Sequence, residues 1–216
     1  MNFSEMKWYD KAFYALAKAV ATVLIALLHP LKISGAENLP KNGSFIIIAN
    51  HVAMWDVFFI SRMLFPLRTL YMAKEELFSY GALFSWIIRC SGGFPVKRGT
   101  ADIGAIKRAL STIKEGHVFG IFPEGTRNKK WEGKLQRFFN GVGYIALASK
   151  APVIPVFFAD TEGFRVFRKV RVFVGEPVNL EDLLQLKITS ESTEKATEHI
   201  LHSVNALIEK SATMVV

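Results

Sequence analysis

A histidine and an aspartate stand five positions apart in the stretch ANHVAMWD, residues 49–56, directly after an apolar run at residues 45–48. On one regular helix the two side chains would point about 140° apart and would not meet. If His51 lies in a strand-to-helix turn and Asp56 in the first helical turn, the carboxylate can reach one imidazole nitrogen. The other nitrogen then faces solvent or substrate, as in a general base that a carboxylate holds in one tautomer.

The same pair also fits a plain structural role, in which a turn histidine precedes an aspartate that interacts favourably with a helix dipole. The sequence has no G-x-S-x-G nucleophile motif and no phosphate-binding G-x4-G-K-[S/T] loop. Residues 141–146, GVGYIA, match a dinucleotide pattern, but the polar segment before them is not a buried strand. A His51 base would therefore act on a hydroxyl of the substrate itself.

Three more segments carry more glycine and polar residues than a core requires: GGFPVKRG at 92–99, FPEGTR at 122–127 and APVIPV at 151–156. We expect the first of them to be a turn. The guanidinium groups of Arg98 and Arg127 suit a phosphate, which they can bind with paired hydrogen bonds. The first two of these segments have a simpler interpretation as surface turns with solvated cations, in which Glu124 pairs with a nearby arginine. The third opens an expected strand.

After Pro30 the chain alternates short β patterns with helical patterns, which predicts an α/β fold with a mixed, largely parallel central sheet flanked by helices. Strands are expected at 31–34, 45–49, 69–72, 117–122, 153–158 and 170–174. Helices are expected at 55–64, 75–88, 101–114 (capped by Thr100), 141–149 and 193–210. Ligands bind at the carboxyl ends of strands in such sheets. The His51 segment and the 122–127 segment each follow a strand.

The composition favours a lipid surface. Half of the 216 residues are apolar, the mean hydropathy is +0.24, the net charge is +8 and the pI is about 9.6. Basic residues gather at 127–137 and 165–171, which favours an anionic membrane face, and no nucleic-acid-binding motif is present. The single Cys90 excludes an internal disulfide, and the five histidines have no metal-ligand spacing, so no metal site is predicted.

The first 30 residues form a separate segment from the domain predicted at 31–216. Residues 4–28 have a helical pattern, and 19–28 carry no charge. Ten apolar residues are too few to span a bilayer, which takes about 20. We therefore expect one helix, or two, lying in one leaflet. A single spanning signal anchor is the rival interpretation.

In this order, the four segments resemble those of the 1-acyl-glycerol-3-phosphate acyltransferases, the lysophosphatidic acid acyltransferases. That family carries N-H-x4-D, G-x-F-x-x-R-type, F-P-E-G-T-R and P-V-x-P-V blocks. The resemblance covers about residues 46–156. Two positions differ from the pattern, since Ala53 and Asn128 stand where the family often has serine. Neither position is expected to take part in proton transfer.

The resemblance implies a glycerolipid acyltransferase-like fold and transfer of a fatty acyl group from a thioester to the hydroxyl of lysophosphatidic acid, which makes phosphatidic acid. His51 would be the base, and Asp56 would orient it. The implied phosphate site consists of Arg98, Glu124, Gly125, Thr126 and Arg127, with Glu124 ordering the arginines. Asn50 and Lys97 are expected to contact donor or acceptor.

No cofactor is implied beyond the donor, which is acyl-CoA or acyl carrier protein. The resemblance also implies a peripheral or monotopic protein on the cytoplasmic face of a membrane. Two alternatives stay open, namely an acyltransferase for glycerol-3-phosphate or another lysophospholipid, and a non-catalytic lipid-binding protein. The intact His51 and Asp56 favour an enzyme, because binding alone needs no imidazole beside a carboxylate.

Overall fold

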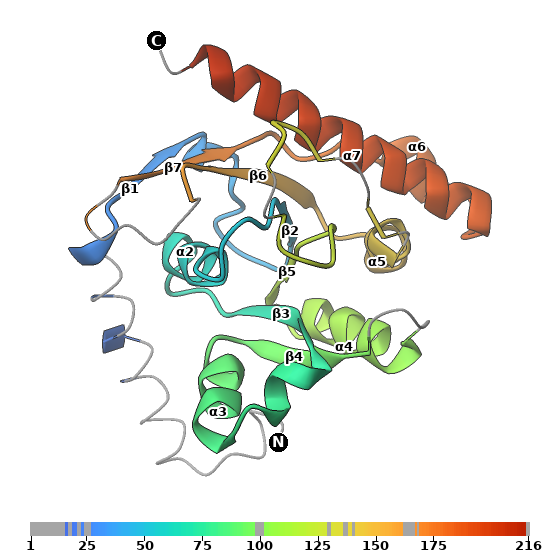
Figure 1. Cartoon of the computed structure of the whole chain (residues 1–216). Coiled ribbons are helices and arrows are strands. Elements are labelled where there is room, and N and C mark those ends of the chain that lie inside the picture. Colours follow the sequence, from blue (N-terminus) through green and yellow to red (C-terminus); the bar gives the residue numbers. More distant parts are fainter. Residues whose placement is uncertain are drawn as a thin grey trace.

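The computed structural model describes residues 16, 19–20, 23, 27–97, 102–128, 131–135, 138–139, 141–161, 167 and 169–214. Within them, one sheet has the strand order β1-β7-β6-β2-β5-β3-β4 (Figure 1). The strands are β1 (Leu31–Ser34), β2 (Ile46–Ala49), β3 (Thr69–Lys74), β4 (Gly93–Val96), β5 (Val118–Ile121), β6 (Val153–Ala159) and β7 (Val170–Val174). Neighbouring strands run parallel except β6 and β7. The expected mixed, largely parallel sheet is confirmed.

Helices flank both faces of this sheet, as Figure 1 shows. They are η2 (Ala36–Asn38), α2 (Asp56–Met63), η3 (Glu75–Ser79), α3 (Ala82–Cys90), α4 (Ile103–Lys114), α5 (Gly141–Ser149), α6 (Glu181–Leu184) and α7 (Ser190–Thr213). Side chains of α4, α5 and α7 form one hydrophobic cluster with the sheet, and side chains of α2 form a second one. The two clusters bury the two faces of the sheet, as a largely parallel sheet requires.

Strand β2 lies in the middle of the strand order, which explains its uninterrupted apolar sequence. Ile46 and Ile48 belong to the cluster with α4, α5 and α7, while Ile47 and Ala49 belong to the cluster with α2. Successive side chains of a strand point to opposite faces, so a strand covered on both sides needs apolar residues at every position. The residues that follow β2 therefore start from a rigid, buried position.

The helix expected at 75–88 is divided in two. η3 ends at Ser79, and α3 begins at Ala82. Between them Gly81 has φ +110°, a conformation that cannot continue a right-handed helix. The helical pattern was predicted correctly before and after Gly81. The break itself was not predicted, because the sequence pattern does not show that Gly81 has a non-helical conformation.

The segment at 93–96, expected to be a turn, is strand β4. It lies at the edge of the sheet and pairs in parallel with β3. Pro95 is tolerated there because an edge strand needs to donate hydrogen bonds on one side only. The expectation of a turn was therefore wrong at these four residues.

Two helix starts also differ from those expected. α4 is capped by Asp102, whose Oδ1 accepts a hydrogen bond from the Ala105 N–H, and not by Thr100, which lies outside the described residues. The Oδ2 atom of Asp102 accepts a second bond, from the Lys97 N–H, so this carboxylate joins the end of β4 to the start of α4. α7 begins earlier than expected, with a reciprocal capping box between Thr189 and Ser192.

Most of the helix expected at residues 4–28 lies outside the described residues. Those that are described there, at 16, 19–20, 23 and 27–28, are helical. None of the helices that can be described combines the length and apolar character needed to cross a membrane. Where this segment meets the sheet domain, Arg62 Nη1 of α2 donates a hydrogen bond to the His29 carbonyl over 2.5 Å.

Gly143 allows α5 and α7 to approach each other closely. A Cβ at this position would lie 2.2 Å from the Thr193 carbonyl oxygen and 2.5 Å from Thr197 Oγ1. The second glycine of the GVGYIA pattern therefore serves helix packing. The rejection of a dinucleotide loop agrees with this structural role.

Gly143→Ala is expected to destabilise the fold, because the added methyl group must push α7 away from α5. Overpacking of this kind costs about 1–3 kcal/mol. Urea denaturation should show a lower midpoint with an unchanged slope. The matched control is Gly141→Ala, where a Cβ meets nothing within 4 Å and stability should stay within about 0.5 kcal/mol. Equal stability of the two variants would contradict the packing role.

Candidate active site

The carboxyl ends of β2, β5, β3 and β4 meet at one edge of the sheet, because these neighbouring strands run parallel. His51 follows β2, residues 122–128 follow β5, and Lys97 follows β4. The first two of these segments are direct neighbours, since β2 pairs with β5. Three of the four segments singled out in the sequence therefore converge here.

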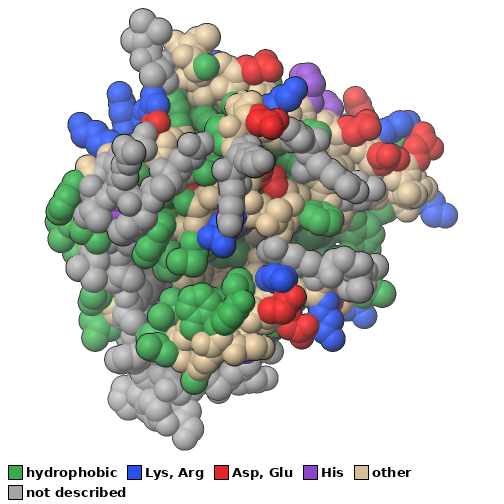
Figure 2. All heavy atoms as spheres, in the orientation of Figure 1, with side chains coloured by type: hydrophobic (Ala, Val, Ile, Leu, Met, Phe, Trp, Pro, Cys, Tyr) green, Lys and Arg blue, Asp and Glu red, His purple; other side chains and the backbone are tan. Residues whose placement is uncertain are grey.

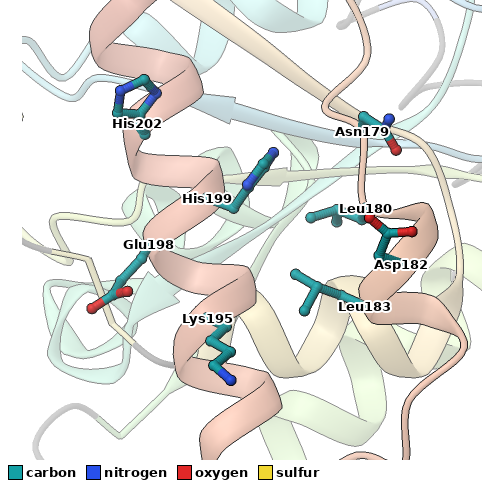
Figure 3. Close-up of a pocket in the computed structure, with 8 residues that line it drawn as sticks. All are labelled: Asn179, Leu180, Asp182, Leu183, Lys195, Glu198, His199 and His202. Atoms are coloured by element: carbon teal, nitrogen blue, oxygen red, sulfur yellow. The ribbon is translucent and has the colours of Figure 1, made fainter.

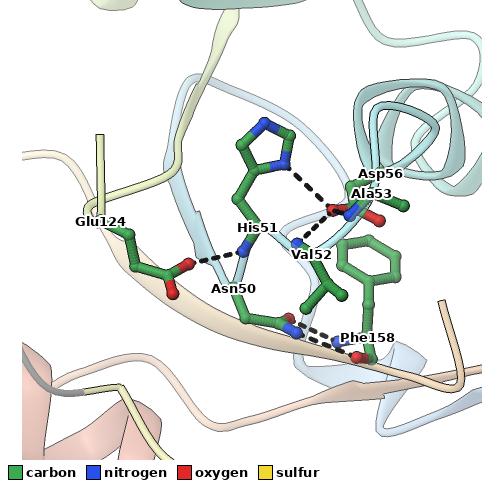
Figure 4. Close-up of polar contacts among 7 residues, drawn as sticks. All are labelled: Asn50, His51, Val52, Ala53, Asp56, Glu124 and Phe158. Atoms are coloured by element: carbon green, nitrogen blue, oxygen red, sulfur yellow. Dashed lines mark hydrogen bonds and ion pairs between the residues drawn. The ribbon is translucent and has the colours of Figure 1, made fainter. Parts of the chain in front are cut away.

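The expected contact between His51 and Asp56 is present, as Figure 4 shows. His51 lies in the turn after β2, and Asp56 is the first residue of α2. The His51 Nδ1 and Asp56 Oδ2 atoms are 3.0 Å apart. The same oxygen accepts hydrogen bonds from the backbone N–H groups of Val52 and Ala53, each over 2.8 Å. Three donors thus meet on one carboxylate oxygen.

Asp56 is completely buried, so its position is determined by these contacts rather than by solvent. Its second oxygen, Oδ1, has no hydrogen-bond partner among the described residues. A carboxylate accepts hydrogen bonds, so the contact places the imidazole proton on Nδ1 of His51. Nε2 is then left with a lone pair, and in Figure 4 this nitrogen points away from Asp56.

Glu124 and Asn128 hold the backbone of His51 from the neighbouring segment. The His51 N–H donates to Glu124 Oε2 over 2.7 Å, and the His51 carbonyl accepts from the Asn128 N–H over 2.7 Å. Burial raises the pKa of the Glu124 carboxyl, while hydrogen bonds from the His51 N–H and the Asn128 side chain act in the opposite direction. Glu124 was expected to order arginines, but its described hydrogen bonds come from the His51 N–H and the Asn128 side chain.

Phe122 stacks on the imidazole of His51. The ring centroids are 4.2 Å apart and the planes are inclined by 26°. The ring of Tyr71 of β3 in turn stacks on Phe122, with 6.1 Å between the two ring centroids. The imidazole is therefore fixed at its edge by Asp56 and at its face by Phe122. Sequence spacing alone did not indicate this role of Phe122.

Asn50 does not contact substrate space, contrary to the expectation. Its side chain is completely buried and makes a pair of hydrogen bonds with Phe158 of β6, donating to the carbonyl over 3.0 Å and accepting from the N–H over 2.8 Å (Figure 4). The amide thus extends the pairing of β2 with β6 by one residue. It anchors the start of the turn that carries His51.

A cleft of about 850 Å³ opens beside His51. Apolar side chains form most of its lining, and α2, α3, α4 and α5 contribute among others Phe58, Ile88, Ile106 and Ile145. Its polar lining includes the expected residues Lys97, Gly125, Thr126 and Arg127. Arg98 lies outside the described residues. The cleft therefore combines a largely apolar lining with the cationic side chains of Lys97 and Arg127.

Gly125 brings the 122–128 segment close to the wall of this cleft. It has φ +68°, and a Cβ on it would lie 2.1 Å from the ring of Phe139. Both the positive φ and the close ring require glycine at this position. Gly125 is thus a structural member of the expected phosphate-binding set, and it lets the chain turn between Glu124 and Thr126.

The fourth sequence segment, 151–156, does not reach the site. Its residues from Val153 onward form β6, which pairs with β2 in the interior of the sheet. Pro152 stands just before this strand, and Pro155 lies inside it, level with Ile48 of β2. The sequence pattern had grouped a core strand with three segments of the carboxyl edge.

A second hollow, of about 600 Å³, lies between α7 and the segment around α6. Figure 3 shows His199 directed toward Leu180 and Asp182, while Glu198 points to the other side of α7. Across the described part of the chain, no group of three or more His, Cys, Asp or Glu side chains is arranged to hold a metal ion. This hollow contains no contact equivalent to that of His51 with Asp56.

Comparison with known proteins identifies related sequences and a related structure. The Acyltransferase family model matches residues 30–159. The chain is 30% identical to 1-acyl-sn-glycerol-3-phosphate acyltransferase of Bacillus subtilis, over 91% of this chain and 98% of that protein. It is 28% identical to the protein of the same name in Saccharomyces cerevisiae, over 82% of this chain and 60% of the yeast protein.

The crystal structure of the 1-acyl-sn-glycerophosphate (LPA) acyltransferase from Thermotoga maritima is also similar. The TM-score is 0.67 at 26% sequence identity, and the match covers 96% of this chain and 85% of that chain.

The raised pKa of Glu124 predicts a specific pH dependence of stability. Between the ordinary and the raised value, the folded state binds more protons than the unfolded state, so this group makes stability fall as pH rises. Glu124→Gln removes this pH-dependent loss of stability, because glutamine does not titrate. The stability of the variant relative to the native protein is therefore expected to increase from pH 4 toward pH 8. Urea denaturation at several pH values measures this difference, and a pH-independent difference would contradict the assignment.

Proposed function

Because this chain belongs to the acyltransferase family, and within it to the 1-acyl-sn-glycerol-3-phosphate acyltransferases, we propose that it transfers a fatty acyl group from a thioester to the free hydroxyl of lysophosphatidic acid. The product is phosphatidic acid, a precursor for phospholipid synthesis. The observation that carries this proposal is the imidazole of His51, oriented by a buried carboxylate, beside a largely apolar cleft.

In the proposed reaction, Nε2 of His51 takes the proton of the acceptor hydroxyl as the hydroxyl oxygen attacks the thioester carbonyl carbon. A carbon–oxygen bond forms and the carbon–sulfur bond breaks. The imidazolium then returns its proton to the thiolate, which leaves as a thiol. No acyl-enzyme is formed, and the reaction takes no metal or cofactor beyond the acyl donor.

The surroundings of His51 suit both the neutral imidazole and the imidazolium, the two protonation states that the proposed reaction needs. Asp56 Oδ2 holds the Nδ1 proton before the reaction, and its negative charge stabilises the imidazolium once Nε2 is protonated. The stacked ring of Phe122 offers its electron-rich face to the same cation. Because Glu124 and Asn128 hold the backbone of His51, little motion is left to the base.

The polar end of the cleft suits the phosphate of the acceptor. Arg127 and Thr126 lie at the end of β5, and Lys97 lies at the end of β4, so cations approach from two sides. We assign acceptor binding to these residues together with Arg98. A guanidinium can hold a phosphate through two parallel hydrogen bonds. The apolar interior would then take the acyl chains of donor and acceptor.

The acceptor is a lipid, so we propose that the enzyme works at the cytoplasmic face of a membrane as a peripheral or monotopic protein. The uncharged stretch at 19–28 and the basic residues at 127–137 and 165–171 support this placement. Glycerol-3-phosphate or another lysophospholipid is the second candidate acceptor. Acyl-CoA and acyl carrier protein are the candidate donors.

His51→Ala is expected to lower turnover by about 10²–10⁴-fold because the acceptor loses its base. Asp56→Asn should also be severe, since a neutral amide does not stabilise the imidazolium. Purified protein is supplied with lysophosphatidic acid and with acyl-CoA or acyl carrier protein in turn, and the product is identified by mass. The control is His199→Ala, an exposed histidine on α7. Near-native turnover by folded His51→Ala protein would exclude this mechanism.

Arg127→Ala is expected to weaken use of the phosphorylated acceptor. Charge-assisted hydrogen bonds are worth about 1.5–3 kcal/mol, which corresponds to roughly 10- to 150-fold in kcat/KM for lysophosphatidic acid. Arg98→Ala should have the same effect. On monoacylglycerol, which lacks the phosphate, both variants should be as active as the native protein. The control is Lys187→Ala, an exposed cation outside the cleft lining and outside both basic clusters. A rise in donor KM alone would assign these arginines to the thioester.

A further inference from the structure

The outer face of α3 carries apolar side chains that the sheet domain does not cover. Leu83 is 72% exposed, Trp86 is 39% exposed and Ile87 is 38% exposed. These positions follow the 3–4 spacing of one helix face. Tyr80, just before the helix, is 73% exposed. In Figure 2, hydrophobic side chains gather on the lower part of the face, in the area where Figure 1 draws α3.

The charge pattern of this region differs from that of an ordinary surface helix. Residues 77–88 contain no charged side chain, although a helix exposed to water normally carries charges on its outer face. Charges occur only at the two ends, with Glu75 and Glu76 before the stretch and Arg89 after it. The guanidinium of Arg89 lies 5.0 Å from the ring centroid of Phe78.

The same helix also forms a wall of the cleft. Phe84, Ile87 and Ile88 line the cleft beside His51. The exposed ring of Tyr80 meets the cleft-lining ring of Phe84 edge to face, with 6.1 Å between centroids. The exposed apolar surface and the apolar cleft are therefore continuous across α3, and no charged residue of this helix separates them.

From this continuity we propose that η3 and α3 dock on the lipid bilayer and that a lipid acceptor enters the cleft along α3, directly from the membrane. This docking surface is defined by Tyr80, Leu83, Trp86 and Ile87. The inference rests on the proposed function for the identity of the acceptor.

The composition of the docking surface favours a bilayer over a second protein chain. Tyrosine and tryptophan are the residues that prefer the boundary between lipid headgroups and hydrocarbon. Arg89, at the end of the apolar stretch, is placed to meet anionic headgroups. A short helix with an apolar face, lying in the plane of the interface, buries that face in the boundary region.

The first experiment tests docking without any need for activity. Leu83→Cys is made in a Cys90→Ala background, so that an environment-sensitive fluorophore labels one position, and phosphatidylcholine–phosphatidylglycerol vesicles are added. The emission of the label is expected to shift to the blue. The control label is carried by Leu186→Cys in the same background, at a leucine that is 53% exposed between α6 and α7. No shift at 83, or an equal shift at both positions, would overturn the proposal.

The second experiment tests lipid entry. Leu83→Asp places a charge in the first turn of α3, where the helix dipole tolerates an acid, and Leu83 is not part of the cleft lining. Turnover of lysophosphatidic acid in vesicles is expected to fall at least tenfold, while turnover of a short-chain acceptor dissolved as monomers stays unchanged. Leu186→Asp should change neither. An equal loss on both substrates would overturn the entry route.

Two further outcomes separate the alternatives. If light scattering without lipid shows a dimer that Leu83→Asp dissociates, the surface binds a second copy of the chain and the proposal is wrong. If the label at position 83 shifts with vesicles but no acceptor is acylated, docking is supported and the proposed function fails instead.

Discussion

The whole site depends on one buried carboxylate oxygen. Asp56 Oδ2 accepts hydrogen bonds from the imidazole of His51 and from the N–H groups of Val52 and Ala53. An ionised carboxylate is costly to bury unless donors surround it, so the turn that supplies these donors and the charge that needs them stabilise each other. Any movement of the turn away from α2 would leave a buried charge unsatisfied. The imidazole of His51 is therefore held in position by the folding of its own loop.

The sheet supplies the second half of this arrangement. β2 lies between β5 and β6, and the residues that follow β5 reach the backbone of His51 through Glu124 and Asn128. On the other side, Asn50 connects the end of β2 to β6. The turn is thus attached to both neighbouring strands, and the imidazole edge opposite Asp56 takes no part in these contacts.

The cleft has a polar part and an apolar part along one edge of the sheet. Cationic and hydroxyl groups come from the loops after β4 and β5, because strand ends expose polar backbone and side chains to solvent. Apolar groups come from helices on both faces of the sheet, because these helices turn apolar sides inward. The cleft is therefore amphiphilic, with Arg127 and Lys97 in its polar part and the helix side chains in its apolar part.

The sequence by itself determined most elements, the acyltransferase family and the contact of His51 with Asp56. Periodicity and turn residues report burial along the chain, so six of the seven strands, most helices and the local contact of His51 with Asp56 were predicted correctly, while the edge strand β4 was not. Only the tertiary structure decided which segments meet. Glu124 bonds to a residue 73 positions away, and that contact exists because β5 pairs with β2. The burial of Asn50 and the position of 151–156 inside the sheet likewise follow from strand order, which depends on packing between distant segments and has no local pattern.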